Sequence, residues 1–311
     1  MRKSLIIGAA GFVGGYLIKE LRGLGDEVYA TKLPCETLSA DCHIADLDIL
    51  DAQSVCTAVS GVMPDRIFHL AAQSSVAVSW KKPALTAQIN VVGAINLFEA
   101  VRAAGCDPVT LLVGSSEEYG AANTADGIIS EECSIHPANI YAATKAAQNC
   151  IGGIYHSAYG MKTVSVRAFN HIGPGQLPQF VISDFCKQTA EIEAGKREPV
   201  IRVGNLSAKR DFTDVRDIVR AYALLAEKGR YGETYNAGSG RAVEIRAVLD
   251  MILSLSPADI SVMTDAARVR PTDVPVICAD IAKITADTGW RPGTDISETI
   301  ADMLDYWRGK L

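Results

Sequence analysis

The first half of the chain alternates short apolar runs with stretches whose apolar residues fall on one face. The runs predict buried strands, and the one-sided stretches predict amphipathic helices. The predicted strands are residues 4–7, 27–31, 66–70, 109–113 and 163–166. The predicted helices are residues 11–24, 52–60, 83–104 and 141–159. This alternation predicts a parallel sheet covered by helices on both faces, which is a doubly wound α/β fold.

The pattern changes after Arg167, where the regular alternation ends. Residues 170–179 are rich in glycine and proline and predict a loop, and a helix at 182–194 and a strand at 200–203 follow. No linker separates two independent domains. We therefore expect a larger unit of residues 1–167 plus about 214–243, and a smaller α/β lobe of residues 168–213 plus about 244–311.

Composition narrows the class of protein. Of the 311 residues, 48% are hydrophobic and 21% are charged, which excludes disordered and fibrous chains. The net charge of −6 argues against nucleic acid or an acidic membrane as partner, but it permits a local basic pocket. The eight cysteines form no Cys-x-x-Cys motif, and the five histidines lack metal-ligand spacing. With neither a signal-peptide pattern nor an apolar stretch of membrane-spanning length, we expect a cytoplasmic protein without a metal.

A glycine-rich turn lies where the first strand meets the first helix. Its sequence is Gly8-Ala9-Ala10-Gly11-Phe12-Val13-Gly14. The N–H groups at a helix N-terminus attract anions, and glycines let the backbone approach a pyrophosphate. We interpret the turn as a dinucleotide site of a Rossmann-type sheet, which makes the larger unit the dinucleotide-binding domain; a tight turn without a ligand is the alternative.

Other residues extend this site. The second strand is followed by Lys32 instead of an acid for the ribose 2′-hydroxyl, which favours NADP(H), with NAD(H) as the alternative. A solvated loop charge is the competing interpretation of Lys32. Asp48 and Ile49 follow the next strand and are candidates for the adenine edge. Leu70, Ala71 and Ala72 supply small residues beside the nicotinamide.

Tyr141 and Lys145 lie one helical turn apart on one face of a predicted helix. Reduction of a ketone needs a proton on oxygen, and a neighbouring ammonium lowers the pKa of a phenol toward the working range. The lysine can also hold the nicotinamide ribose. Ser115 follows a strand, where α/β sheets bind ligands, and could donate to the same oxygen. A surface pair and a loop cap are the alternatives.

Taken in this order, the motifs resemble the extended short-chain dehydrogenase/reductase family. In the second half, residues 169–176, 203–206 with 210–212, and 270–275 look like its GDP-mannose branch, and most like the reductases of that branch. The resemblance implies reduction of the C4 ketone of GDP-4-keto-6-deoxy-D-mannose to GDP-6-deoxy-D-mannose (GDP-D-rhamnose). The smaller lobe would then bind the nucleotide sugar.

The resemblance also implies the residues that contact the sugar nucleotide. The candidates are Asn170, Val181, Lys187, Leu206, Arg210, Arg270 and Asp273. Two phosphate charges entering an acidic protein need local Arg and Lys to offset them. Arg210 and Arg270 are in loop contexts that could converge. Ordinary Arg–Asp surface pairs with Asp211 and Asp273 are the alternative.

Glu117 leaves a second activity open. In the related GDP-mannose 4,6-dehydratases, a glutamate at this place abstracts the C5 proton of the sugar. The glycine turn, the absence of an Arg-rich segment around Lys32 and the Val274-Pro275 ending look like the reductases, so we expect Glu117 to be an auxiliary polar contact. The alternatives are a dehydratase with Glu117 as base, a UDP-sugar 4-epimerase, and an NADP-sensing regulatory protein without turnover.

The two longest predicted helices suggest an assembly. Residues 83–104 and 141–159 carry apolar side chains on more than one side. Because one helix face suffices to cover a sheet, the additional apolar face predicts a homodimer through a four-helix contact.

Overall fold

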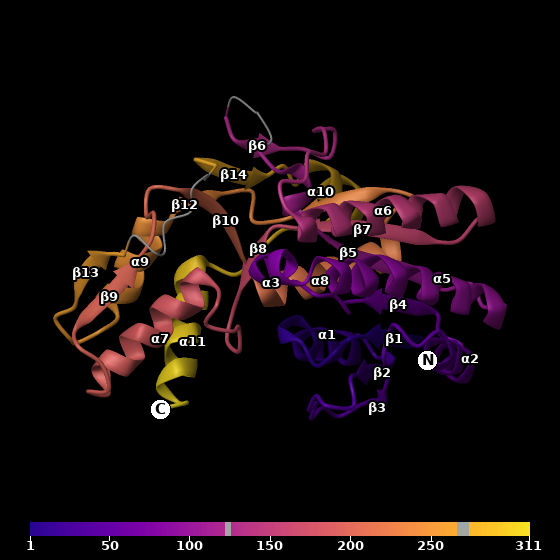
Figure 1. The fold of residues 1–311 in the computed structure, drawn as a ribbon, viewed down its shortest axis with the longest axis horizontal. Helices are drawn as coiled ribbons and strands as arrows, with labels where there is room; N and C mark the ends of the chain where they lie inside the picture. The colour runs from indigo at the N-terminus through magenta and orange to yellow at the C-terminus, as the bar shows by residue number, and fades with distance from the viewer. Residues whose placement is uncertain (122–125, 266–273) are drawn as a thin grey trace.

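The computed structural model describes residues 1–121, 126–265 and 274–311. Its larger part is a seven-stranded parallel sheet with helices on both faces (Figure 1). In spatial order the strands are β11 (Thr234–Ala237), β7 (Thr163–Ala168), β5 (Val109–Ser115), β4 (Arg66–His69), β1 (Lys3–Ile7), β2 (Glu27–Lys32) and β3 (His43–Asp46). The predicted doubly wound parallel fold is confirmed.

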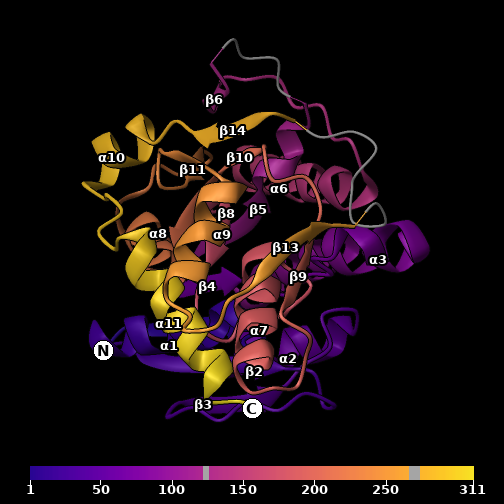
Figure 2. The ribbon, with the colours of Figure 1, turned by 90° about the vertical axis from the view of Figure 1, so that its left-hand side faces the viewer.

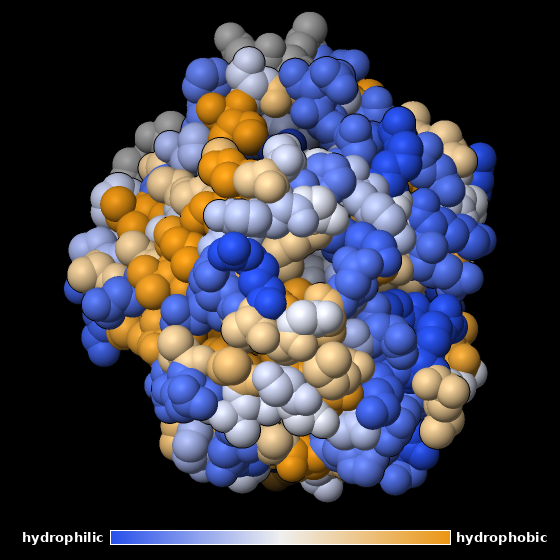
Figure 3. All heavy atoms as spheres, turned by 90° about the vertical axis from the view of Figure 1, so that its right-hand side faces the viewer, coloured by the Kyte–Doolittle hydropathy of each residue, from blue (hydrophilic) through white to orange (hydrophobic). Residues whose placement is uncertain are grey.

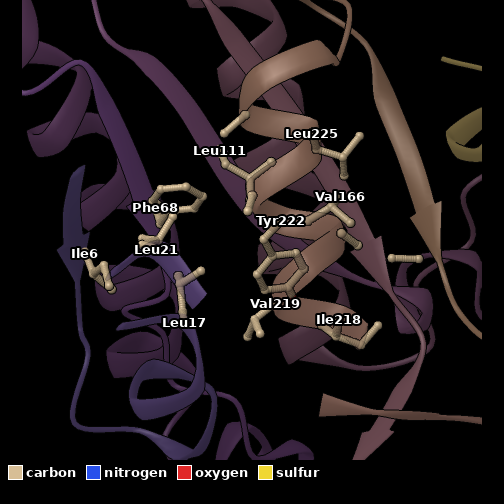
Figure 4. Packing of buried hydrophobic residues seen from close by; sticks show 14 of the residues in the cluster. Ile6, Leu17, Leu21, Phe68, Leu111, Val166, Ile218, Val219, Tyr222 and Leu225 are labelled. Carbon is tan, nitrogen blue, oxygen red and sulfur yellow. The ribbon is translucent and has the colours of Figure 1, made fainter. Parts of the chain in front are cut away.

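Alternate residues of the central strands enter two separate cores. Ile6, Phe68 and Leu111 face one layer, which contains α1 (Phe12–Gly23), α8 (Val215–Lys228) and α10 (Ala282–Thr288). Figure 4 shows this core, in which the leucines of α1 and the apolar face of α8 meet the sheet. Period-two alternation in a strand buried on both faces explains why the strands read as continuous apolar runs.

The opposite face of the sheet carries the residues between these, such as Ile7 and Leu112. Its helices are α2 (Ala52–Val62), α5 (Gly93–Ala104) and α6 (Ile140–Tyr159). The long helix predicted at 83–104 is divided into α4 (Pro83–Ala87), a π-helical turn η1 (Gln88–Val92) and α5. By length and composition residues 83–104 could cross a membrane, whereas we expected no apolar stretch long enough to do so. Side chains of this stretch belong to the core, as those of core helices in globular proteins do.

The smaller part has its own core, built on short strands and three helices (Figure 2). One sheet has the order β12 (Ala242–Glu244), β10 (Lys209–Asp214), β14 (Val276–Ala279) and β6 (Ile128–Ile129), and β8 (Asn170–Ile172) also pairs with β10. A second pairs β13 (Ser261–Thr264) with β9 (Val200–Val203). The helices are α7 (Val181–Glu193), α9 (Ile245–Ser254) and α11 (Ile296–Arg308).

The chain crosses between the two parts more than once. Trp290 and Ile284, in the range expected for the smaller lobe, are buried in the core of the large sheet. Conversely, β6 belongs to the range expected for the larger unit but pairs with β14 of the smaller sheet. The division of the chain stays a prediction, and these elements depart from it.

The order of the strands fixes where a ligand can enter. The chain leaves β1 toward β2 and β3 on one side, and continues through β4 and β5 on the other. In open parallel sheets ligands bind at the carboxyl ends of the strands, beside such a reversal. The glycine-rich turn follows β1, and Ser115 ends β5, so both candidate regions lie at this edge.

Candidate active site

The glycine-rich turn is held by close backbone approaches. Gly8 has a φ of +84°, and a Cβ there would lie 2.6 Å from the Cα of Ala71. A Cβ on Gly14 would lie 2.0 Å from the carbonyl oxygen of Ala9. The N–H groups of Leu70 and Ala71 both donate to the carbonyl of Ile7. The turn and the segment after β4, which leads on to Ala72, are thus packed directly together, and only glycine fits at positions 8 and 14.

A cavity of about 580 Å³ adjoins the turn. It is lined by α1 as far as Arg22, by residues 38–41, and by Pro174 and Gly175 of the smaller part. Gly11 lines it, and a Cβ on Gly11 would meet no heavy atom within 4 Å. Among the described residues no side chain caps α1 at Gly11. Because the first N–H groups of a helix lack partners within the helix, this open turn fits the pyrophosphate of a dinucleotide.

Phe12 and Val13 begin α1, and the side chain of Phe12 joins the two parts of the molecule. Its ring stacks on that of His171, with 6.1 Å between centroids. One turn further along α1, the Tyr16 hydroxyl donates to the carbonyl of Pro174 at 2.8 Å. Val13 packs against the core of the large sheet. These contacts fix the entrance of the candidate dinucleotide site to the loop that leads into the smaller part.

Lys32, the candidate for a 2′-phosphate, ends β2 beside the glycine turn. Its Nζ lies 2.5 Å from Oδ1 of Asp46, its register partner in β3. The preceding residue, Thr31, accepts the N–H of Ala9 at 2.7 Å. Lys32 is therefore close to the turn and ion-paired with Asp46, so a phosphate bound there would share the Lys32 ammonium with that carboxylate.

The two candidates for the adenine edge differ in their surroundings. Asp48 is exposed, and its Oδ1 accepts the N–H of Leu50 at 2.9 Å. The Ile49 side chain is buried in the core, and its carbonyl accepts from Asn96 of α5 at 2.9 Å. A side-chain contact with a ligand is consequently open to Asp48, whereas Ile49 packs against α5.

Ser115, Tyr141 and Lys145 come together at the carboxyl end of β5. Tyr141 and Lys145 are in the first turns of α6, which begins where Oδ1 of Asn139 accepts the N–H of Ala142. The Ser115 hydroxyl is close enough to the Tyr141 phenol to lower the pKa of the phenol. The Lys145 ammonium donates to the carbonyl of Val113 at 2.7 Å, two residues before Ser115. All three side chains are largely buried.

The charges of this group differ from the expectation in one respect. We expected Lys145 to lower the pKa of Tyr141. Instead, burial raises the pKa of Tyr141 to about 12, although the Ser115 hydroxyl acts to lower it. The physical reason is that desolvation disfavours the phenolate, and the negative charges of Glu117 and Glu118 act in the same direction. Burial also lowers the pKa of Lys145 to about 8, although the charge of Glu118 acts in the opposite direction. At neutral pH Tyr141 therefore keeps its proton and can act as an acid.

Glu117 lies at the rim of this group. Its Oε2 accepts from Nδ2 of Asn139 at 3.0 Å, and its N–H donates to the Ser115 hydroxyl at 3.2 Å. The carboxylate is half-buried and close enough to Tyr141 to raise the pKa of the phenol. Such a position is compatible with a polar contact to a sugar and with a base.

Sequence reasoning missed two buried residues that support the site. Glu118 binds the N–H of Ser115, and the spacing Ser115-x-x-Glu118 is a capping-box signal that could have indicated it. Asn90, in the π-helical turn, donates to Thr144 at 2.9 Å and to the carbonyl of Gln73 at 3.1 Å. It thereby joins α6 to the segment after β4. An isolated asparagine in an apolar helix gives no comparable signal.

The candidates for the sugar nucleotide are spread over the smaller part. Asn170 is exposed in β8, and Val181 is exposed at the start of α7. Lys187 pairs with Glu191 at 3.6 Å and lies over the Trp307 ring. Leu206 packs against the core of the smaller part.

The loop context expected for Arg210 is wrong. Arg210 lies in β10, paired with Val243 and Ile277, because β12 and β14 provide neighbours that a local pattern does not reveal. Its Nη1 donates to the carbonyl of Val274 at 2.8 Å, which ties it to the segment that follows the Arg270 motif. Arg270 and Asp273 lie outside the described residues.

Comparisons with known proteins show the family of the chain. Residues 5–303 match the family model described as GDP-mannose 4,6 dehydratase. A GDP-6-deoxy-D-mannose reductase of Pseudomonas aeruginosa is 32% identical over 249 residues, which are 80% of this chain and 82% of the relative. A GDP-mannose 4,6-dehydratase of Vibrio cholerae is 26% identical, over 97% of this chain and 93% of the relative.

A solved structure shares the whole fold. It is RMD from Pseudomonas aeruginosa complexed with NADPH, and it superposes with a TM-score of 0.86 at 29% identity, covering 100% of both chains. The resemblance inferred from the motifs is thereby confirmed at the level of the family and the fold.

Proposed function

The chain belongs to the GDP-mannose 4,6 dehydratase family, and we propose that within it the protein is an NAD(P)H-dependent reductase of the C4 ketone of GDP-4-keto-6-deoxy-D-mannose, forming GDP-6-deoxy-D-mannose. The observation that carries this proposal is the group of Ser115, Tyr141 and Lys145, whose side chains are buried together at the carboxyl end of β5. The similarity to a GDP-6-deoxy-D-mannose reductase supports the choice of substrate.

In this proposal the cofactor is held by the glycine turn and the edge of the sheet. The N–H groups at the start of α1 bind the pyrophosphate at Gly11, which is open to the cavity, while Gly8 and Gly14 let the turn pack against Ala71 and Ala9. NADP(H) is favoured because Lys32 can reach a 2′-phosphate and because the similar Pseudomonas structure contains NADPH. When bound, the reduced nicotinamide supplies a hydride to the carbon of a ketone.

The side chains provide the proton and the orientation. Tyr141 donates its proton to the ketone oxygen, which would otherwise carry a negative charge in a buried site. Ser115 donates a hydrogen bond to the same oxygen and so orients it. Lys145 places a positive charge behind the phenolate that remains, and it can hold the ribose of the cofactor. Glu117 serves as a polar contact for the sugar.

The smaller part offers cations for the two phosphates of a GDP-sugar. Arg210 and Lys187 are the candidates within the described residues, and Arg270 follows from the motif alone. Arginine suits this task because its planar fork binds phosphate oxygens in pairs. Asn170, Val181, Leu206 and Asp273 complete the proposed set of contacts.

A second function is favoured by one specific observation. Glu117 stands beside Tyr141, and the Vibrio cholerae relative is a GDP-mannose 4,6-dehydratase. In a dehydratase, Glu117 would remove the proton next to the ketone. That reaction leaves the cofactor unchanged overall, whereas the reduction consumes NADPH.

Turnover of purified protein tests the choice between these functions. We expect stoichiometric oxidation of NADPH with GDP-4-keto-6-deoxy-D-mannose and no conversion of GDP-mannose to the keto sugar. UDP-linked keto sugars serve as the control for the nucleotide. Conversion of GDP-mannose without consumption of NADPH would instead establish the dehydratase.

We also expect a homodimer through the outer faces of η1 and α6. Val92 is 44% exposed and Ile154 is 55% exposed, although both are apolar. Figure 3 shows the side of the molecule where α5 and α6 end, with apolar residues gathered toward one margin. The mass measured by light scattering should be twice 33.1 kDa, and Ile154→Asp should yield the monomer.

A further inference from the structure

Glu118 is a fully buried carboxylate beneath the candidate catalytic serine. It is the third residue of the short 3-10 helix η2 (Ser116–Tyr119), which follows β5 directly. Its Oε1 accepts the backbone N–H of Ser115 at 2.8 Å. Its Oε2 accepts from Nε of Arg167 at 2.9 Å, and Asn149 donates to both oxygens. One side chain therefore connects β5, β7 and α6.

The surroundings are shaped to this carboxylate. A Cβ on Gly114 would lie 2.4 Å from Oε1 of Glu118 and 2.4 Å from Nδ2 of Asn149. The sequence consequently leaves room for Glu118 by placing glycine in the strand, where glycine otherwise weakens pairing. The guanidinium of Arg167 balances the charge and also donates to the Tyr119 hydroxyl at 2.9 Å. A buried ion pair of this kind persists only with such complete hydrogen bonding.

The contact with Ser115 is the part that bears on chemistry. Ser115 has two polar attachments in this turn: its N–H is bound by Glu118, and its hydroxyl accepts the N–H of Glu117 at 3.2 Å. The hydroxyl also meets the Tyr141 phenol. Rotation of the Ser115 backbone would swing the hydroxyl away from the phenol. Displacement of a catalytic group by about 1 Å can reduce the rate about 100-fold.

We propose that Glu118 is a positioning residue, which clamps the backbone N–H of Ser115 and thereby holds the serine hydroxyl against Tyr141. This proposal rests on the proposed function only in taking Ser115 as the group that orients the substrate oxygen. Among the described residues the Glu118 carboxylate binds Ser115, Asn149 and Arg167, and it makes no hydrogen bond to the phenol. Its charge also acts to raise the pKa of Tyr141 and of Lys145, so a loss that depends on Ser115 distinguishes the clamp from this direct electrostatic effect.

A double-mutant cycle with Ser115 tests this dependence. Glu118→Ala removes the acceptor, and we expect kcat to fall about 10- to 100-fold in the natural background. In a Ser115→Ala background the same change should reduce kcat less than about 3-fold, because the hydroxyl is already gone. Glu118→Gln keeps an acceptor for the N–H and should recover part of the loss. Equal losses in both backgrounds would overturn the proposal, as would unchanged kcat.

A second variant that is expected to fold, and a matched control, separate an effect on kcat from a loss of stability. If Glu118→Ala does not fold, Glu118→Leu with Arg167→Met replaces the ion pair by apolar residues, an exchange that buried pairs can tolerate. The control is Asp26→Asn, which breaks the buried pair of Asp26 with Arg66 at the opposite edge of the same sheet. The control should lose stability and keep kcat per folded molecule.

Hydrogen exchange separates this proposal from the proposed function, because it needs no substrate. In the Glu118 variants the amide of Ser115 should exchange at least about 10-fold faster than in the natural protein, while the amides of Leu111 and Leu112 in β5 stay protected. Uniform loss of protection along β5, or an unchanged Ser115 amide, would contradict the clamp. Absence of any keto-sugar turnover in the natural protein would refute the proposed function and leave this measurement valid.

Discussion

A buried pair of a carboxylate and a guanidinium lies at each end of the strands of the large sheet, and we infer a different role for each pair. We call the amino-terminal ends of the strands the amino edge and the carboxyl-terminal ends the carboxyl edge. At the amino edge, Asp26 pairs with Arg66 of β4 and accepts the Ser4 hydroxyl of β1 at 2.6 Å. At the carboxyl edge, Glu118 pairs with Arg167 of β7 and binds the N–H of Ser115. Each is a buried carboxylate with a buried guanidinium, and each joins several strands.

What differs is the surroundings of each pair. Asp26 and Arg66 hold the amino-terminal ends of β1 and β4, whereas Ser115 lies at the carboxyl end of β5. Glu118 holds a turn whose first residue contacts Tyr141, next to Lys145 and the glycine turn. The comparison indicates that a buried ion pair affects catalysis when the residue that it positions takes part in the reaction. We therefore expect the amino edge to govern stability and the carboxyl edge to govern turnover.

The largest effect should come from removing the proton donor at the carboxyl edge. Tyr141→Phe deletes the phenolic hydroxyl in a buried position and leaves the ring. We expect kcat for reduction of the keto sugar to fall about 1000-fold, since general acid catalysis contributes on that order. Steady-state oxidation of NADPH measures it. The affinity of the variant for the dinucleotide should stay within about 3-fold of that of the natural protein. A kcat close to that of the natural protein would contradict the role given to the carboxyl edge.

At the amino edge the expected loss is in stability. Asp26→Asn leaves the Arg66 guanidinium buried without its counter-charge, which typically lowers the free energy of unfolding by about 3–5 kcal/mol. Urea unfolding measures the loss. Turnover per folded molecule should be unchanged. A drop in kcat at full folding would mean that the amino edge also controls the site.

The effect that is smallest per unit of pH concerns His69, the last residue of β4 at the carboxyl edge. Burial lowers its pKa to about 3, and neither ring nitrogen has a hydrogen-bond partner among the described residues. Between pH 6.5 and 3 the unfolded chain therefore binds one proton more at this position than the folded chain. As the pH decreases over this range, protonation of His69 in the unfolded chain should lower the free energy of unfolding by about 1.4 kcal/mol per pH unit.

A variant isolates this contribution from that of the carboxylates. In His69→Gln the dependence of unfolding free energy on pH over this range should be shallower by one proton. Equal slopes in the two proteins would show that His69 is protonated, or solvated, in the folded state.

Local patterns predicted most of the fold and the centre of the candidate site. The apolar runs of β1, β5 and β7 and the spacing of Tyr141 and Lys145 are properties of a few adjacent residues. Helix α6 begins one residue before the predicted range 141–159 and ends with it, and Asn139 and Gly160 lie at its two caps. By contrast β3, an edge strand with all four residues exposed, carries no apolar pattern, so the strand expected before Asp48 was given no residue range.

The remaining features depend on partners distant in the sequence. Glu118 looks like a surface charge until Arg167, 49 residues away, enters beside it. Arg210 becomes a strand residue because β12 and β14 pair with it. The raised pKa of Tyr141 follows from burial, which spacing along a helix does not reveal. Such long-range effects explain why the support of the site was harder to predict than its chemistry.

The destination of the transferred hydrogen tests the central claim most directly. The protein is incubated with GDP-4-keto-6-deoxy-D-mannose and NADPH deuterated at the transferable position, and the product is examined by NMR. We predict one deuterium at C4 of the product sugar and a proton from solvent on its C4 oxygen, supplied through Tyr141. A product without deuterium at C4, or a keto sugar returned unreduced, would contradict the account.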